Sequence, residues 1–281
     1  MELAEILKFI RVNTEWLYTV LYQNKYFFFD YWSLVHFFSG FFIPVILSNL
    51  RIRRIYLITF LLLVLYEVVE IYLIYIAFNI FKPETIKDQI TDILVGLSGL
   101  FLNFRLGKYI FNSRNEIKYS SYFPAIVTSL TISFFWVGFY QYRYNYDFLN
   151  SSGLNFWAFG CWSVSILIIC ISFSHFKDKF SNKLKFYPIF YLFYLTSLLT
   201  VEFVGYKILG IKEIAHINSD SLIFNLIHGT TTLHIYYLLA PFIAILINKI
   251  IFTLWQNYLT SFELNEIKLK NKILRTVSIS D

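Results

Sequence analysis

Residues 55–81, IYLITFLLLVLYEVVEIYLIYIAFNIF, decide the class of fold because they form an apolar run of membrane-spanning length. A helix needs about 20 apolar residues to cross the roughly 30 Å hydrocarbon core of a bilayer. Glu67 and Glu70 are the only charged residues in this run, and an ionisable side chain is costly in lipid. The stretch therefore predicts a transmembrane helix with two acidic groups on one face, at positions i and i+3.

The composition of the whole chain agrees with this stretch. Of its 281 residues, 57% are hydrophobic and only 15% are charged, whereas a soluble domain carries about 25% charged residues. The net charge of +6 comes from short Lys and Arg clusters between apolar runs, a pattern typical of membrane loops rather than of a nucleic-acid-binding face. We therefore expect a lipid bilayer as partner and no nucleic acid.

Hydropathy predicts an all-α fold, a polytopic bundle of about seven transmembrane helices. The third predicted span is the shortest, and the amphipathic N-terminal residues 1–22 are predicted to form a helix in the membrane interface. The predicted spans are 31–50, 55–81, 89–104, 122–140, 155–175, 186–208 and 221–248.

These spans divide the chain into four parts. We expect an interfacial amphipathic segment at 1–29, a three-helix unit at 30–120, four further transmembrane helices at 121–250 and a cytoplasmic polar tail at 251–281. With seven spans, every cluster of Lys and Arg falls on one side of the membrane. Because such clusters stay in the cytoplasm, the N-terminus is predicted outside and the C-terminus inside. The abundance of Lys, Asn, Ile, Phe and Tyr favours a bacterial source, and hence the cytoplasmic membrane.

Ionisable residues inside the predicted spans are the candidates for function, because lipid exposure of such groups is unfavourable. Most of them lie toward the outer leaflet. His36, Glu67, Glu70 and Asp92 are the predicted catalytic residues. Residues with a predicted substrate-binding or supporting role are Asp88, Glu202, His228 and His234.

A stripe of small and polar residues predicts how the first three spans pack. Asp88, Asp92, Gly96, Gly99 and Asn103 recur at helical spacing on one face. Small residues allow close helix packing in lipid, so this face is expected to contact the other two spans and bring the predicted catalytic residues together. An imidazole beside carboxylates can bind a divalent metal or divide general-acid and general-base roles. The sequence does not decide between these chemistries.

Residues 30–104 resemble the VanZ-like membrane proteins. The resemblance rests on Asp30-Tyr-Trp-Ser-Leu-Val-His36-Phe-Phe-Ser-Gly40, on the Glu67 and Glu70 pair, and on Asp88 with Asp92-Ile-Leu-Val-Gly96-Leu-Ser-Gly99. Asp30 stands further from His36 than is usual in that family, and Gly96 replaces an expected Asn. The resemblance implies a polytopic protein linked to glycopeptide resistance and the cell envelope, with no defined reaction.

Three functions are compatible with these features. The first is a membrane enzyme of the cell envelope with a water-reachable outer-leaflet pocket, acting on a lipid or a lipid-linked substrate. The second is a proton-coupled transporter, because chains of Asp, Glu and His form proton relays. The third is an accessory subunit whose polar residues only hold helices together. The one-sided distribution of the ionisable residues favours the first.

Overall fold

The computed structural model describes residues 3–76, 85–112, 122–177, 179–180, 183–216 and 229–277. Within these residues the chain is almost entirely helical, with one two-stranded sheet. It divides into two compact units, which we call unit 1 (Met1–Ser120 with Phe252–Asp281) and unit 2 (Ser121–Ile251).

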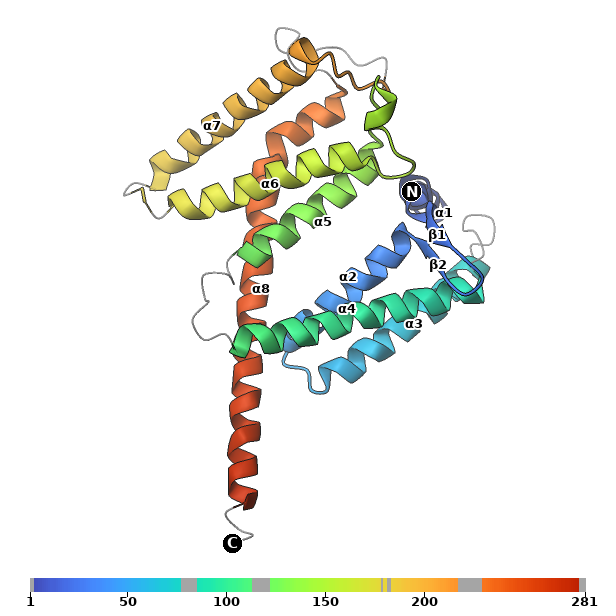
Figure 1. Cartoon of the computed structure of the whole chain (residues 1–281), viewed down its shortest axis with the longest axis vertical. Helices are drawn as coiled ribbons and strands as arrows, with labels where there is room; N and C mark the ends of the chain where they lie inside the picture. Colours follow the sequence, from blue (N-terminus) through green and yellow to red (C-terminus); the bar gives the residue numbers. More distant parts are fainter. Residues whose placement is uncertain are drawn as a thin grey trace. The chain divides into compact units, whose positions relative to one another are not determined.

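Unit 1 contains a short N-terminal helix, a β-hairpin and three long helices (Figure 1). A 3₁₀ turn at Glu15–Tyr18 joins the first helix to the hairpin, whose strands pair antiparallel. The elements are α1 (Leu3–Thr14), β1 (Val20–Gln23), β2 (Phe28–Asp30), α2 (Tyr31–Asn49), α3 (Ile55–Ile76), α4 (Ile86–Asn112) and the second part of α8 (Thr231–Val277).

The helices α2 and α4 run parallel to each other, and α3 runs antiparallel to both. Near its start α2 contacts α4 through Ser33 and Asp92, and further along it contacts α4 through Phe41 and Asn103. The helix α3 runs the other way, because Tyr56, near the start of α3, packs against Phe104 in the later part of α4. The three helices therefore lie side by side over much of their length (Figure 1).

Glycines allow α2 and α4 to approach backbone to backbone. A Cβ atom added to Gly40 would lie 1.8 Å from the carbonyl oxygen of Gly96, and one added to Gly99 would lie 2.0 Å from that of Phe37. Nothing larger than hydrogen fits at either position. The close packing that the small-residue stripe predicted is confirmed for these two helices.

Unit 2 contains α5 (Tyr122–Tyr140), α6 (Phe156–Lys177), α7 (Lys183–Phe203) and the first part of α8. The helix α7 continues into a π-helical turn at Val204–Ile208. Side chains of α7 and α5 contact α8. The Tyr194 hydroxyl on α7 donates to the carbonyl of Tyr237 at 2.6 Å, and Thr128 on α5 contacts Asn248.

Six helices among the described residues are long and apolar enough to cross a membrane. Large apolar side chains are exposed along them; Leu184 is 83% exposed, and Leu192 and Phe193 are 66% and 63% exposed. Such a surface suits lipid rather than water. The chain is an integral membrane protein made of helices. The six are Tyr31–Asn49, Ile55–Tyr72, Tyr122–Tyr140, Phe156–Lys177, Leu184–Ile208 and Thr231–Ser261.

The prediction of one interfacial helix over residues 1–22 was wrong in its second half. The helix ends at Thr14, and a hairpin follows. The side-chain oxygen of Asn24 accepts the backbone N–H groups of Tyr26 and Phe27, both at 2.7 Å, and so fixes the turn between the strands. With only this small hairpin beside the helices, the described chain is still an all-α helical bundle.

The predicted polar tail from residue 251 is helical as far as the structure describes it. The helix α8 continues to Val277, and Trp255 and Tyr258 are buried in unit 1. The ring of Trp255 stacks on that of Phe41, and the Tyr258 hydroxyl donates to Asn103 at 2.7 Å. The described part of α8 begins at Thr231; the first eight residues of the predicted span 221–248, with His228, lie outside the described residues.

Candidate functional site

The site begins with the cap of α2. Asp30 is the N-cap residue, and its carboxylate accepts the backbone N–H of Ser33 at 3.0 Å, while the Ser33 hydroxyl oxygen accepts the N–H of Asp30. The same hydroxyl donates to Oδ1 of Asp92 on α4 at 2.7 Å. The capping box therefore fixes a serine that in turn holds a buried carboxylate.

One turn after Ser33, the imidazole of His36 lies between two carboxylates. Its Nδ1 is 3.4 Å from Oε1 of Glu67, and its Nε2 is 3.6 Å from Oδ2 of Asp92. The ring also packs against Tyr66, with centroids 5.2 Å apart and planes at 73°. Three helices thus each contribute one polar side chain to the same point, and tight packing holds the imidazole between them.

Glu70 completes this cluster from the next turn of α3. One nitrogen of His36 and one carboxylate oxygen from each of Glu67 and Glu70 lie within 4.8 Å of one another. His36, Glu67 and Asp92 are buried, at 4%, 4% and 3% exposure, whereas Glu70 is half-buried. The cluster is therefore closed on the side of α2 and α4, and Glu70 lies at its more accessible side.

Two further acids lie next to the cluster, just outside the predicted spans. Burial raises the pKa of Asp30 to about 6, although hydrogen bonds from Ser33 and Trp32 lower it in part. Burial and the neighbouring charge of Asp30 together raise the pKa of Asp88 to about 7. Acidic groups outnumber the single imidazole here. Such a site lowers its energy by keeping protons or by binding a cation.

The remaining predicted residues lie in unit 2 or outside the described residues. Glu202 accepts a hydrogen bond of 2.5 Å from the hydroxyl of Tyr237. His234 is buried, with its ring centroid 6.4 Å from that of Tyr237. Neither belongs to the unit that contains the His36 cluster. His228 falls outside the described residues.

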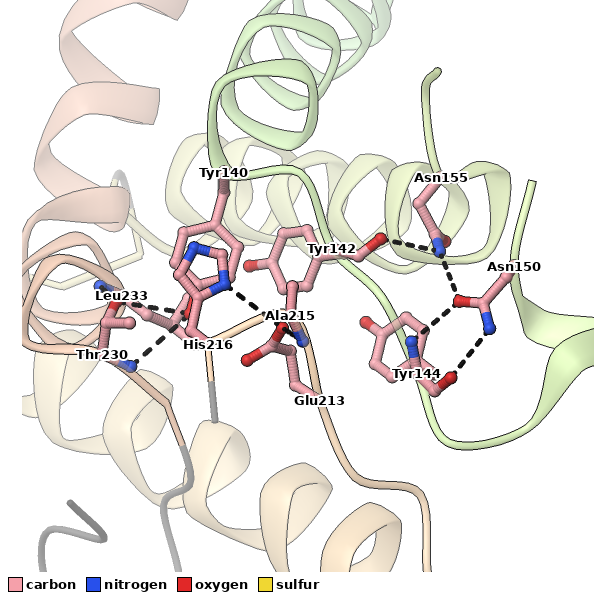
Figure 2. A network of polar contacts seen from close by, with 10 residues as sticks. All are labelled: Tyr140, Tyr142, Tyr144, Asn150, Asn155, Glu213, Ala215, His216, Thr230 and Leu233. Carbon is pink, nitrogen blue, oxygen red and sulfur yellow. Dashed lines mark hydrogen bonds and ion pairs between the residues drawn. The ribbon is translucent and has the colours of Figure 1, made fainter. Parts of the chain in front are cut away.

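Unit 2 has a polar network of its own, at the loops that join its helices (Figure 2). Tyr142 is buried, and its hydroxyl accepts the indole N–H groups of Trp136 and Trp162, both at 3.0 Å. Tyr144 forms a backbone bridge with Glu213. The network thus supports the segment that carries Glu213.

Ser33 and Glu213 are two polar residues of these sites that sequence reasoning missed. Asp30 and Ser33 have the spacing of a capping box, which signals a helix start but not a contact with α4. Glu213 lies in a loop where an acidic residue is ordinary, so no signal marked it. No protein-family model, curated protein or solved structure matches this chain.

Proposed function

We propose that this protein is a membrane enzyme of the bacterial cell envelope that binds a divalent metal ion through His36, Glu67 and Glu70. The observation that carries the proposal is the grouping of these three side chains, with their ligand-type atoms within 4.8 Å of one another. Imidazole and carboxylate together suit zinc and manganese rather than a purely oxygen-binding calcium site.

The separation of the ligand atoms supports this proposal. Zinc binds imidazole nitrogen and carboxylate oxygen at about 2.0–2.2 Å, so two such ligands at a tetrahedral angle stand about 3.4 Å apart. His36 Nδ1 and Glu67 Oε1 are 3.4 Å apart. This distance is long for a hydrogen bond between nitrogen and oxygen. It matches two ligands of one metal ion.

The surroundings of His36 support a catalytic metal rather than a structural one. Three protein ligands leave a coordination position for water or substrate, as in catalytic zinc sites. Asp92 faces the other ring nitrogen of His36, and Ser33 orients Asp92. A carboxylate within hydrogen-bond distance of this nitrogen fixes the tautomer and direction of a metal-binding histidine; Asp92 is 3.6 Å away and would have to move slightly closer. His36, Glu67 and Glu70 would thus be ligands, and Asp92 a positioning residue.

The substrate class follows from the location of the site. A metal that polarises a phosphoryl or acyl oxygen, or that activates a water molecule, supports hydrolysis or group transfer. The ligands are on helices of membrane-spanning length, so we propose a lipid or lipid-linked substrate of the envelope. The likeness of residues 30–104 to VanZ-like proteins supports the same cellular role.

The proposal includes seven spans, with α4 as the seventh. The helix α4 is not among the six helices that are apolar enough to cross a membrane. However, α4 runs parallel to α2 and contacts it from Asp92 to Asn103. The length of this contact, about 17 Å at 1.5 Å per residue, supports α4 as a membrane-spanning helix beside α2.

Metal binding by the purified protein tests the proposal. After treatment with a chelator, the wild-type protein in maltoside detergent should bind one equivalent of Zn²⁺ or Mn²⁺ in equilibrium dialysis. Glu70→Gln should weaken binding about 100-fold, because a ligand oxygen loses its charge, and it is the best variant because Glu70 is only half-buried. Glu15→Gln, at an exposed position, is the matched control.

The result also separates the alternatives. If wild-type protein binds neither ion at 100 µM, or if Glu70→Gln binds as well as wild type, the metal site is wrong. A proton carrier would instead acidify or alkalinise proteoliposomes without added metal. An accessory subunit would neither bind the metal ion nor move protons across the membrane.

A further inference from the structure

Unit 2 contains a half-open cavity of about 530 Å³ among α6, α7, the first part of α8 and the connecting loops. This volume is typical of sites for small molecules. One face of α6, from Trp157 to Ser172, lines it, and this face is about 22 Å long at 1.5 Å per residue. The cavity is thus long enough for an extended hydrocarbon chain.

The lining changes character along this length. Phe173 on α6 packs against Phe190 on α7, so apolar side chains lie at this end. Glu202 is twelve residues further along α7, or about 18 Å. There the wall also includes Tyr144 and Glu213, which pair through a backbone bridge. The region between the ends is mostly apolar, although Ser165, Ser172 and Ser197 also line it, and a mostly apolar region with a polar end suits an amphiphile.

The polar end is acidic. The side chain of Glu213 is 94% buried, since 6% of its surface is exposed. Its Oε1 accepts the N–H of Ala215 at 2.7 Å and faces His216, but its Oε2 has no hydrogen-bond partner among the described residues. Glu202 is the second carboxylate in the wall. A buried carboxylate oxygen without a partner is costly, and a cationic ligand would relieve that cost.

The loops around Glu213 hold it in place. Asn145 and Lys212 exchange backbone and side-chain hydrogen bonds at 2.8–3.0 Å. The N–H of Ile214 donates to the carbonyl of Arg143 at 2.7 Å. Asn150 accepts the N–H of Tyr144 and donates to its carbonyl (Figure 2). The carboxylate is therefore fixed in advance of any ligand.

Aromatic side chains surround the same end. Tyr144, Trp157, Tyr206 and Tyr237 all line the cavity. Aromatic faces attract ammonium groups, most strongly when water is excluded. Among the described residues, no Lys or Arg lines the cavity; Lys207 and Lys212 lie over the ring of Tyr206, at 4.9 and 5.7 Å.

We propose that this cavity binds a single-chain amphiphile with an ammonium head group, whose nitrogen lies between Glu213 and Glu202 and whose chain extends along α6 toward Phe190. The observations that carry the proposal are the cavity, its two carboxylates and its aromatic walls. It is independent of the metal site proposed for unit 1.

Photo-crosslinking tests this proposal in the full-length protein in maltoside detergent. Three probes share a twelve-carbon chain with a diazirine and differ in the head group: an amine, an alcohol or a sulfate. At pH 7 the amine should label α6 and α7 peptides at least about 10-fold more than the alcohol. The sulfate should label them least. Equal labelling by all three, or preference for the sulfate, would overturn the proposal.

Variants locate the head group. Glu213→Gln and Glu202→Gln should each lower the ratio of amine to alcohol labelling at least about fivefold, whereas Glu15→Gln should leave it unchanged. The ratio of amine to alcohol labelling is used because a distorted pocket would bind both probes less well and so leave their ratio unchanged. An unchanged ratio in both cavity variants would mean that the carboxylates do not bind the head group, and the proposal would be wrong.

Discussion

At the scale of single residues, the pH dependence of stability depends on Asp30. Its pKa is about 6 in the folded protein against 3.8 in the unfolded chain, because burial disfavours the charged form. A group whose pKa is raised by folding stabilises the protein most at low pH. This contribution is lost as the pH rises through the window from about 4 to 6. Asp88, with a pKa near 7, extends the loss in the same direction.

We therefore expect the midpoint of thermal unfolding in detergent to be higher at pH 4.5 than at pH 7. Asp30→Asn should reduce this difference, because the amide keeps the helix cap but has no charge to bury. Asp147→Asn, at an exposed position, is the control. A difference that is unchanged in Asp30→Asn, or a higher midpoint at pH 7, would contradict the expectation.

The residues of the unit 1 cluster could be predicted because their cost in lipid is visible in the sequence. His36, Glu67, Glu70 and Asp92 each interrupt an apolar run, and helical phase indicates which of them share a face. Glu213 could not be predicted, because its burial results from the way two loops pair, Tyr144 with Glu213, and neither loop has a periodic pattern.

At the scale of elements, the contact of α2 with α4 depends on glycine. Gly40→Ala and Gly99→Ala each place a methyl group about 2 Å from a backbone carbonyl, so the helices must separate. Overpacking of this kind costs about 3 kcal/mol or more where only backbone can move. Separation would also move Asp92 away from His36.

The measurement is the unfolding midpoint of each variant, together with Zn²⁺ binding by equilibrium dialysis. Both should fall for Gly40→Ala and Gly99→Ala. Gly160→Ala on α6 is the matched control, because an added Cβ meets nothing within 4 Å there. If all three variants melt at the same temperature, close approach of α2 and α4 is not what stabilises unit 1.

Elements without a lipid-facing signal were predicted least well. The strands β1 and β2 lie outside the apolar runs, and the second part of α8 lies beyond the predicted span 221–248, although the apolar helix Thr231–Ser261 includes its start. The burial of Trp255 and Tyr258 depends on partners on α2 and α4 that are far away in the sequence. Sequence patterns report the period of an element but not which distant neighbour covers it.

At the scale of the whole molecule, the number of spans decides which face each loop occupies. If the N-terminus is outside, as the basic clusters predict, and α4 crosses the membrane, the hairpin tip at Asn24 and the loop at Asp147 lie outside and Arg53 lies inside. Without it, Asn24 and Asp147 lie on opposite sides. The hydrogen bond from Lys87 to the carbonyl of Asn24 already places the start of α4 beside the hairpin.

Cysteine labelling distinguishes these topologies. In a background of Cys161→Ser and Cys170→Ala, single cysteines replace Asn24, Arg53 or Asp147, which are all exposed. A membrane-impermeant maleimide should label Asn24→Cys and Asp147→Cys on intact cells, and Arg53→Cys only after permeabilisation, because its basic cluster is predicted to face the cytoplasm. If Asp147→Cys requires permeabilisation while Asn24→Cys does not, α4 does not cross the membrane. The metal ligands would then lie beside a helix whose two ends are on the same side of the membrane. A site enclosed by three membrane-spanning helices would be ruled out.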